Sequence, residues 1–422
     1  MNVLWFNVTE PSGYKNNNLV IGGWQSSLEE IIKQDSNIKL HVAFEAKNLN
    51  DKPKSINNVT YIPFQVQFNL IERIRKKWNF QVYAKKVLVQ CIKIVESIKP
   101  DIIHVFGTEW PYGLIQKYTK IPVVIHIQGA IIPYCNALYP PQYNEISFVL
   151  KNFWNIRKWV SFFIHKSYYN SWKKTEAEIW DAVSYYMGRT CWDKSVVNVQ
   201  HPGATYYHVE EALRQSFINN ENTWEQPEQN KKKILLSTGC STYWKGPDML
   251  LKTAVLLKKI KFDFTWYVAG QMPKEIKSYV EYMEQQKFSD NNVEFLGMVN
   301  PDKLQKLLCN SNLYIHTAYI ENSPNSVCEA QITGIPIIST NVGGIESLVH
   351  QDQEGILVPA NDPWRMAYSI IELSSNLEKQ QKFSANGINH AKNRHNPDNI
   401  HNQLIYCYQD IIKKTHSENK KL

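Results

Sequence analysis

Short apolar runs alternate with amphipathic stretches through the first 130 residues of the chain. The stretches 24–34 and 83–98 carry apolar residues three and four positions apart, which is the spacing of an amphipathic helix. Strand-to-helix alternation of this kind predicts a parallel sheet that is covered by helices on both faces. The runs expected to form its strands are 3–8, 40–44, 101–107 and 122–129.

A second series of the same kind begins after the polar stretch 219–233, which we interpret as a linker or surface loop. We assign 1–200 to a first domain, 201–395 to a second domain and 396–422 to a final helix. The predicted fold class is α/β, with two Rossmann-like domains whose parallel sheets face a central cleft. The strands expected in the second domain are 233–239, 264–270, 292–297, 312–318 and 335–341.

The stretch 316–344 predicts a binding site for an anion. We expect Ser323 to cap a helix whose first residue is Pro324, where the missing amide hydrogen costs nothing. The free amides of Asn325 and Ser326 would then point out of the helix terminus. A helix N-terminus of this kind favours a negatively charged ligand such as phosphate.

Two glutamates flank this helix terminus, Glu321 and Glu329. Carboxylates bind hydroxyl groups rather than phosphates, so the pattern favours a sugar and a ribose on either side of a phosphate. Gly343 and Gly344 follow the next strand and allow close approach of the backbone. The alternative is an ordinary strand–helix–strand unit with surface glutamates, and the order of the surrounding elements weighs against it.

Composition narrows the class of protein further. With 43% hydrophobic and 20% charged residues, the chain has globular composition, and its net charge of +8 is a mild excess. Seven cysteines without a Cys-x-x-Cys pair argue against a disulfide framework and a zinc knuckle. No apolar run reaches the length of a membrane span, and the broken apolar start favours a strand over a signal peptide.

With these motifs in this order, the chain resembles the retaining GT-B glycosyltransferases of family four, the group 1 bacterial polysaccharide and lipid glycosyltransferases. The resemblance covers nearly the whole chain and implies the GT-B fold, with the final helix crossing back to the first domain. The pieces that carry it are Gly22-Gly23, PDIIHVFG, IPVVIHIQG, STYWKGPDML, FTWYVAG, VEFLG, the Glu321–Glu329 block and EGILVPANDP.

The resemblance also implies roles for individual residues. Glu321 would contact hydroxyls of the transferred sugar, Glu329 would hold the ribose, and Lys245 would neutralise the diphosphate. Gly22 and Gly23 would let the backbone approach the donor phosphates, although a simple tight turn explains them equally well. The remaining donor-binding candidates are Ser323, Asn325, Ser326, Gly343 and Gly344.

Two positions depart from the family pattern. Cys240 stands where the family usually has an arginine, so the diphosphate would rely on Lys245, backbone amides or another cation. Gln128 stands where the family usually has a histidine. We therefore assign Glu321, Lys245, Gln128 and His126 as catalytic candidates and favour Gln128 over His126, whose alternative is a buried strand histidine.

The reaction implied is the transfer of a hexose-type sugar, with retention, from a nucleotide sugar to a saccharide or lipid-linked acceptor in cell-surface polysaccharide synthesis. The leaving phosphate would take the acceptor's proton. No Asp-x-Asp pair occurs, so we expect no metal, and no cofactor is expected because the nucleotide sugar is a substrate. Two alternatives are a nucleotide-sugar epimerase of the same fold and a non-catalytic sugar-nucleotide-binding protein.

The segment 146–175 contains six Lys or Arg residues, nine aromatic residues and no acidic residue. We expect one amphipathic helix that contacts an anionic membrane surface, which places the protein in the cytoplasm and on the inner face of the plasma membrane. The alternative is a helix that packs on the core. No nucleic-acid partner is expected. Arg189, Asp193 and His208 are further polar candidates, for which ordinary salt-bridged structure is the favoured interpretation.

Overall fold

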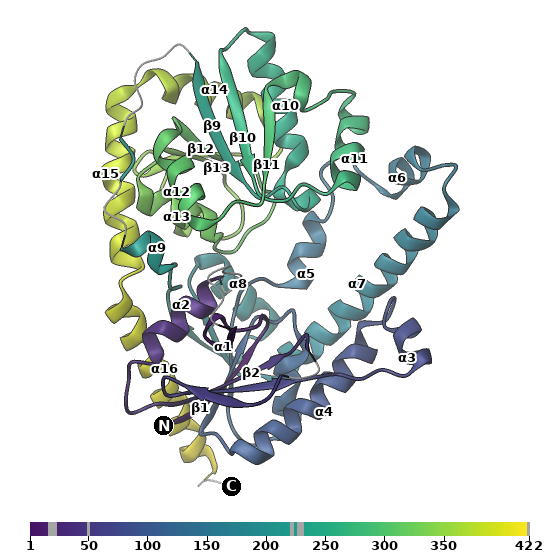
Figure 1. Cartoon of the computed structure of the whole chain (residues 1–422), viewed down its shortest axis with the longest axis vertical. Helices are drawn as coiled ribbons and strands as arrows, with labels where there is room; N and C mark the ends of the chain where they lie inside the picture. The colour runs from purple at the N-terminus through teal and green to yellow at the C-terminus, as the bar shows by residue number, and fades with distance from the viewer. Residues whose placement is uncertain (16–22, 49–50, 220–222, 226–231, 420–422) are drawn as a thin grey trace. The chain divides into compact units, whose positions relative to one another are not determined.

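The computed structural model describes residues 1–15, 23–48, 51–219, 223–225 and 232–419. The chain forms two compact units (Figure 1). Unit 1 comprises Met1–Pro133, Arg157–Ala212 and His395–Leu422, and unit 2 comprises Tyr134–Ile156 and Leu213–Arg394.

Unit 1 is built on an eight-stranded sheet with the order β3-β4-β2-β1-β5-β6-β7-β8. Its paired strands are parallel except for β3 and β4. The strands are β1 (Asn2–Asn7), β2 (Lys39–Glu45), β3 (Lys54–Ile56), β4 (Val59–Phe64), β5 (Ile102–Phe106), β6 (Val123–His126), β7 (Tyr185–Gly188) and β8 (Thr205–His208). The helices are α1 (Ser12–Lys15), α2 (Gly23–Ile32), α3 (Leu70–Arg75), α4 (Phe80–Ile98), the 3₁₀ helix η1 (Pro111–Tyr118), α5 (Ile131–Tyr134), α7 (Ile156–Ala182), α8 (Cys191–Gln200) and α16 (Pro397–Asn419).

Unit 2 is built on a six-stranded parallel sheet with the order β11-β10-β9-β12-β13-β14. The strands are β9 (Lys233–Thr238), β10 (Phe264–Ala269), β11 (Val293–Gly297), β12 (Leu313–His316), β13 (Ile337–Thr340) and β14 (Gly355–Val358). The helices are α6 (Glu145–Lys151), α9 (Gln215–Ile218), α10 (Pro247–Lys259), α11 (Lys274–Glu284), α12 (Pro301–Asn310), α13 (Asn325–Thr333), α14 (Pro363–Ser375) and α15 (Leu377–Arg394). Short 3₁₀ turns are η2 (Cys135–Ala137), η3 (Tyr243–Lys245), η4 (Ser289–Asn291) and η5 (Ile345–Ser347).

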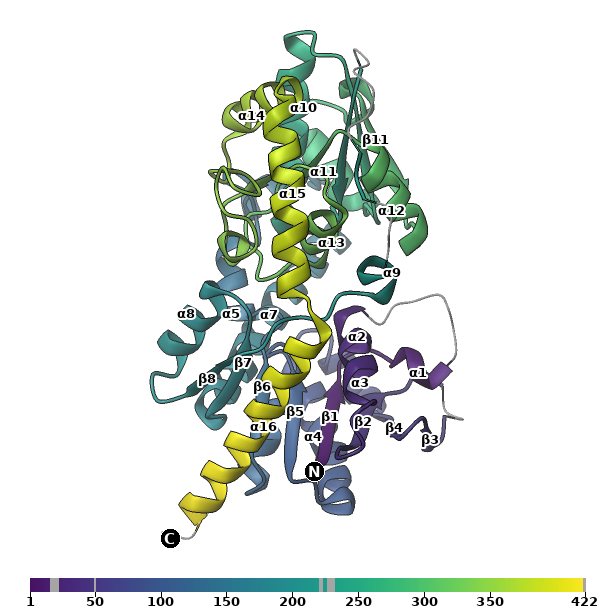
Figure 2. The ribbon, with the colours of Figure 1, turned by 90° about the vertical axis from the view of Figure 1, so that its left-hand side faces the viewer.

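Each sheet is buried on both faces, as the apolar runs predict. In β1, Val3 and Trp5 pack into one core while Leu4 and Phe6 pack into the other, because successive side chains of a strand point to opposite faces. The first of these cores is closed by α16, which lies over the sheet of unit 1 (Figure 2). The α/β class and the nine strands expected from the sequence are therefore confirmed.

Four strands of unit 1 were not predicted from the sequence: β3, β4, β7 and β8. β4 contains Pro63, which weakens a strand signal, and the other three strands are only three or four residues long. Because β8 pairs with β7 at the edge of the first sheet, unit 1 continues to Ala212 rather than ending at the expected residue 200.

The segment 134–156 packs within unit 2, although we expected it in the first domain. Tyr143 donates a hydrogen bond to Glu284 at 2.8 Å, and Lys151 donates one to Ser278 at 2.7 Å. Of the polar stretch 219–233, part lies outside the described residues, but Trp224 is buried and its indole donates to the Ser311 carbonyl.

The predicted single helix over 146–175 is wrong, because α6 ends at Lys151 and α7 begins at Ile156. Asn152 ends α6, and its carbonyl accepts from the Asn155 amide in the intervening turn. Among the described helices, none is both long and apolar enough to cross a bilayer.

The Tyr408 hydroxyl joins α16 to the sheet of unit 1. It accepts a hydrogen bond from the Trp5 indole at 2.9 Å and lies 2.6 Å from Nδ1 of His104, and all three side chains are buried. We predict that Tyr408→Phe lowers the free energy of unfolding by about 1–3 kcal/mol, because it leaves buried polar atoms without a partner. Urea denaturation measures the change. The exposed Tyr406 on the same helix provides the control, and an equal loss in Tyr406→Phe would contradict the assignment.

Candidate functional site

The carboxyl ends of β9 and β12 adjoin at the point where the strand order of unit 2 reverses. From β9 the chain builds β10 and β11 on one side, and it then returns to place β12 on the other side. In open α/β sheets, ligands bind outside the carboxyl ends of the strands at such a reversal. Lys245 follows β9 and Glu321 follows β12, so each of the two strands supplies one charged residue to this point.

Lys245 and Glu321 form an ion pair, with 2.5 Å between Nζ and Oε1. Nε2 of His316, the last residue of β12, lies 3.3 Å from the same oxygen. Burial alone raises the pKa of Glu321, but Lys245 and His316 outweigh it and hold that pKa at about 2. The site therefore contains a buried carboxylate that stays ionised at neutral pH, beside a lysine that is partly exposed.

Two glycines allow the backbone to close around this pair. Gly246 has φ +71°, and a Cβ there would meet the Thr317 carbonyl oxygen at 1.9 Å. Gly343 has φ +54°, and a Cβ there would lie 1.8 Å from the carbonyl oxygen of Glu321. The Gly344 amide donates to that same carbonyl at 3.0 Å. Gly343 and Gly344 thus hold the backbone of Glu321 in place.

The predicted start of the next helix is wrong by one residue. Pro324 is the N-cap of α13, because its ψ of 118° keeps it extended, and Asn325 is the first helical residue. Ser323 therefore precedes the N-cap and does not occupy the expected position. The amides of Asn325 and Ser326 still lie in the first turn, where helix geometry leaves them without intrahelical acceptors. Gly334 ends the helix with φ +90°, as predicted.

Glu329 is buried on α13 and is engaged by Arg214. The guanidinium Nε donates to Oε1 of Glu329 at 2.7 Å, and Nη2 contacts the same oxygen. Cys240 lies in the hydrophobic core beside β9, and burial raises the pKa of its thiol to about 12, so it supplies no charge here.

In unit 1, the candidates lie around the carboxyl ends of β5 and β6. His126 is fully buried, with its ring centroid 4.7 Å from that of Trp24, and burial holds its pKa well below the ordinary value. Gln128 lies two residues beyond β6 and is only partly buried. Gly23 opens α2 with φ +50° and has space around it, whereas Gly22 lies outside the described residues.

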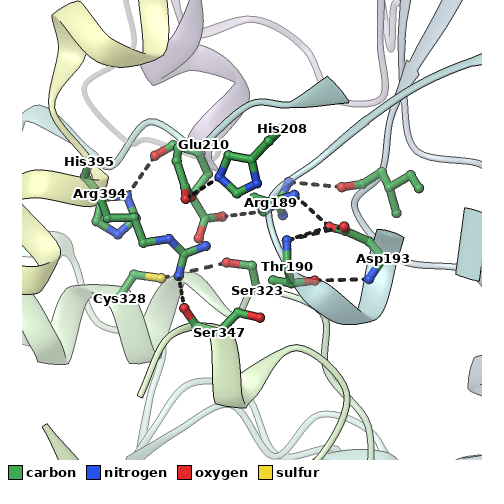
Figure 3. A network of polar contacts seen from close by, with 12 residues as sticks. Arg189, Thr190, Asp193, His208, Glu210, Ser323, Cys328, Ser347, Arg394 and His395 are labelled. Atoms are coloured by element: carbon green, nitrogen blue, oxygen red, sulfur yellow. Dashed lines mark hydrogen bonds and ion pairs between the residues drawn. The ribbon is translucent and has the colours of Figure 1, made fainter. Parts of the chain in front are cut away.

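Arg189, Asp193 and His208 make structural contacts in unit 1 (Figure 3). Arg189 is buried, pairs with Glu211 at 3.2 Å and donates to the Ile127 carbonyl at 3.0 Å. The Asp193 carboxylate accepts from the Arg189 amide at 2.8 Å, and His208 lies 2.8 Å from Glu210. Arg189 is therefore salt-bridged, as the favoured interpretation has it, whereas the Asp193 carboxylate accepts hydrogen bonds from the backbone amides of Arg189 and Thr190.

The part of unit 2 that carries the pair is similar to known proteins. Residues 219–390 match the family model of the group 1 glycosyl transferases. An uncharacterized glycosyltransferase of Methanocaldococcus jannaschii, MJ1607, is 24% identical over 43% of this chain and 46% of its own length, so the chain spans less than half of that relative.

Two solved structures share the fold over nearly the whole chain. Sucrose-phosphate synthase from Thermosynechococcus elongatus is 13% identical with a TM-score of 0.69, and covers 98% of this chain and 99% of its own. Anabaena Alr3699/HepE in complex with UDP-glucose is 14% identical with a TM-score of 0.62, and the match covers 99% of this chain and 100% of that chain. The chain therefore has the GT-B fold of these two structures.

Three polar residues near these sites were missed by the sequence reasoning: His316, Arg214 and Glu109. His316 looks like an ordinary strand residue, and Arg214 lies far from Glu329 in sequence. Glu109 follows β5 by three residues, so the rule that ligands bind at strand ends could have found it. The pKa of Glu109 is raised to about 8, mainly because the carboxyl is buried and also because Glu176 lies nearby. A Cβ at Gly107 would lie 2.0 Å from the Glu109 carboxyl and 3.6 Å from Gln128 Nε2.

The Lys245–Glu321 pair predicts how substitutions at these two positions change the free energy of unfolding. Lys245→Met should destabilise the protein by about 3–5 kcal/mol at pH 7, because it leaves a buried carboxylate without its cation. Adding Glu321→Gln should recover part of that loss, since the neutral amide needs no cation. Urea denaturation of the single variants and the double variant measures the coupling. A double variant whose loss is the sum of the two single losses would contradict the pairing.

The same pair predicts a pH dependence. The folded pKa of Glu321 is about 2 against an ordinary value of 4.5, so its ionisation contributes about 3 kcal/mol of stability above pH 4.5. That contribution disappears as the pH falls from 4.5 toward 2. The stability difference between the unmutated protein and Glu321→Gln should therefore narrow over this range.

Proposed function

We propose that this chain is a retaining glycosyltransferase that moves a hexose-type sugar from a nucleoside diphosphate donor to a saccharide or lipid-linked acceptor. The observation that carries the proposal is the ionised, buried Glu321 held by Lys245 and His316 at the sheet reversal of unit 2. The group 1 family match over the same residues supports it. A similar structure binds UDP-glucose, so uridine diphosphate sugars are the first donors to test.

Lys245 has a different partner in each state of this mechanism. Without donor it neutralises Glu321, and with donor its flexible ammonium turns to the diphosphate, whose charge grows as the sugar bond breaks. Backbone amides at the start of α13 add two donors for the phosphate. Because Cys240 supplies no charge, Lys245 and the backbone amides carry the task of neutralising the diphosphate.

Glu321 then acts on the sugar. Once Lys245 turns away, its carboxylate accepts hydrogen bonds from sugar hydroxyls and stabilises the positive charge that develops at the anomeric carbon. The leaving phosphate takes the acceptor's proton, so no protein base and no catalytic metal are required. Glu329, oriented by Arg214, binds the ribose hydroxyls.

The acceptor is proposed to contact unit 1 through Gln128 and Glu109, which flank Gly107 at the strand ends. With a pKa of about 8, Glu109 is mostly protonated at neutral pH and can donate a hydrogen bond. His126 is buried beside Trp24, so we assign it no contact with substrate.

Glu321→Ala should lower kcat by about 10²–10³-fold or more while the protein stays folded, since it removes charge stabilisation at the reacting carbon. Release of nucleoside diphosphate from a panel of nucleotide sugars, with and without acceptor, measures transfer. The exposed Glu294 on β11 gives the control variant, Glu294→Ala. Activity that survives in Glu321→Ala would overturn the assignment, and donor turnover without any acceptor would favour the epimerase.

We also propose that the apolar tip, which we define as Ile146, Leu150, Phe153, Trp154 and Ile156, contacts an anionic membrane from the cytoplasmic side. These side chains are 55–93% exposed, and Trp154 is the most exposed. The core-packing alternative describes other residues of the segment, because Phe148, Tyr168 and Trp172 pack against the cores. Arg157 and Lys158 follow immediately and add positive charge for acidic headgroups.

Replacing Phe153 and Trp154 by glutamate should weaken binding to vesicles that contain acidic phospholipid by about tenfold or more. Co-sedimentation with such vesicles, compared with neutral phosphatidylcholine vesicles, measures the effect. Trp364→Glu changes another exposed tryptophan of unit 2 and should leave binding intact. Equal losses in both variants, or no binding to acidic vesicles, would contradict this proposal.

A further inference from the structure

Unit 2 contains a second charged cluster that takes no part in the Lys245–Glu321 pair. His350 and Glu354 lie in the turn before β14, and His390 lies on α15. Nδ1 of His350 is 3.0 Å from Oε2 of Glu354, and Nδ1 of His390 is 3.2 Å from Oε1. One ring nitrogen of each histidine thus faces the same carboxylate from opposite elements of the fold.

We propose that His350, Glu354 and His390 bind a divalent transition-metal ion of the zinc class, which ties the turn 350–354 to α15. Two imidazole nitrogens and one carboxylate oxygen are a common zinc ligand set, with water in the fourth position. In a tetrahedral zinc site with bonds of about 2.0–2.1 Å, the ligand atoms lie roughly 3.3 Å apart. Nδ1 of His350 and Nδ1 of His390 each lie 3.2 Å from Oε1 of Glu354, which is close to this value. One ligand atom from each of the three residues lies within 4.8 Å of the other two.

The surroundings suit a bound cation. Glu354 is only 7% exposed, whereas the side chains of His350 and His390 are 47% and 22% exposed, which leaves a route for the ion and room for water. The neighbouring lysines are directed elsewhere: Lys379 pairs with the Asp352 carboxylate at 3.1 Å, and Lys382 donates to the Asp352 carbonyl at 3.2 Å. These contacts of both ammonium groups are therefore with Asp352 rather than with the Glu354 carboxylate.

The turn is already fastened to one face of α15. Lys382, Asn386 and His390 are four residues apart on that helix and contact Asp352, Gln353 and Glu354 in order. A metal ion would replace the hydrogen bond between His390 and Glu354 with a coordinate bond to each of these two residues. Because it binds the folded state, it should raise the thermal stability of the protein.

Calorimetric titration of the full chain with zinc chloride alone tests the proposal. We expect one saturable equivalent, and a Tm that rises by several degrees at saturation. His350→Gln and His390→Gln should each weaken zinc binding by at least tenfold. His401→Gln is the matched control. His401 lies on α16 and is paired with Asp35 at 3.0 Å, so this variant should bind zinc like the unmutated protein.

Cobalt(II) absorbance of the unmutated protein decides the ligand type without any variant. Nitrogen and oxygen ligands give a ligand-field spectrum without a thiolate charge-transfer band, which supports the site. A thiolate band, no saturable binding, or affinity unchanged in both His350→Gln and His390→Gln would overturn it.

Discussion

The ion pair between Lys245 and Glu321 is the interaction around which the candidate site is organised. A carboxylate this deeply buried would be expected to be protonated, yet Lys245 and His316 keep it ionised at neutral pH. The pair connects the segments that leave β9 and β12, so it depends on the sheet reversal that brings those two strands together. The same reversal thus determines both the fold of unit 2 and the position of its charge.

The backbone is shaped to support this pair. Gly246 lies against Thr317, and Gly343 lies against the carbonyl of Glu321, at distances that exclude a side chain. These close approaches fix where the two charged side chains start, and the Lys245 side chain is partly exposed. A buried carboxylate beside a partly exposed ammonium suits a reaction in which negative charge appears on a departing diphosphate.

Sequence patterns were sufficient for the parts of the site that are local in the chain. The apolar runs located the strands that precede Lys245 and Glu321, and the Gly-Gly turn was recognisable from its place after β13. Contacts made by distant segments were not predictable in this way. Arg214 reaches Glu329 across 115 positions, and segment 134–156 joins unit 2 although its sequence lies within the first half of the chain. Ser323 failed as a cap because the backbone angle of Pro324, which a sequence pattern does not reveal, moved the helix start to Asn325.

The central claim is that Lys245 leaves Glu321 to bind a diphosphate. Calorimetry of nucleoside diphosphates and monophosphates tests it most directly when Glu321→Gln is compared with the Lys245→Met/Glu321→Gln double variant, because neither protein contains an unpaired buried carboxylate. Our account predicts that Glu321→Gln binds the preferred nucleoside diphosphate at least about tenfold more tightly than the monophosphate, and that the double variant loses most of this preference. An undiminished preference in the double variant would contradict it.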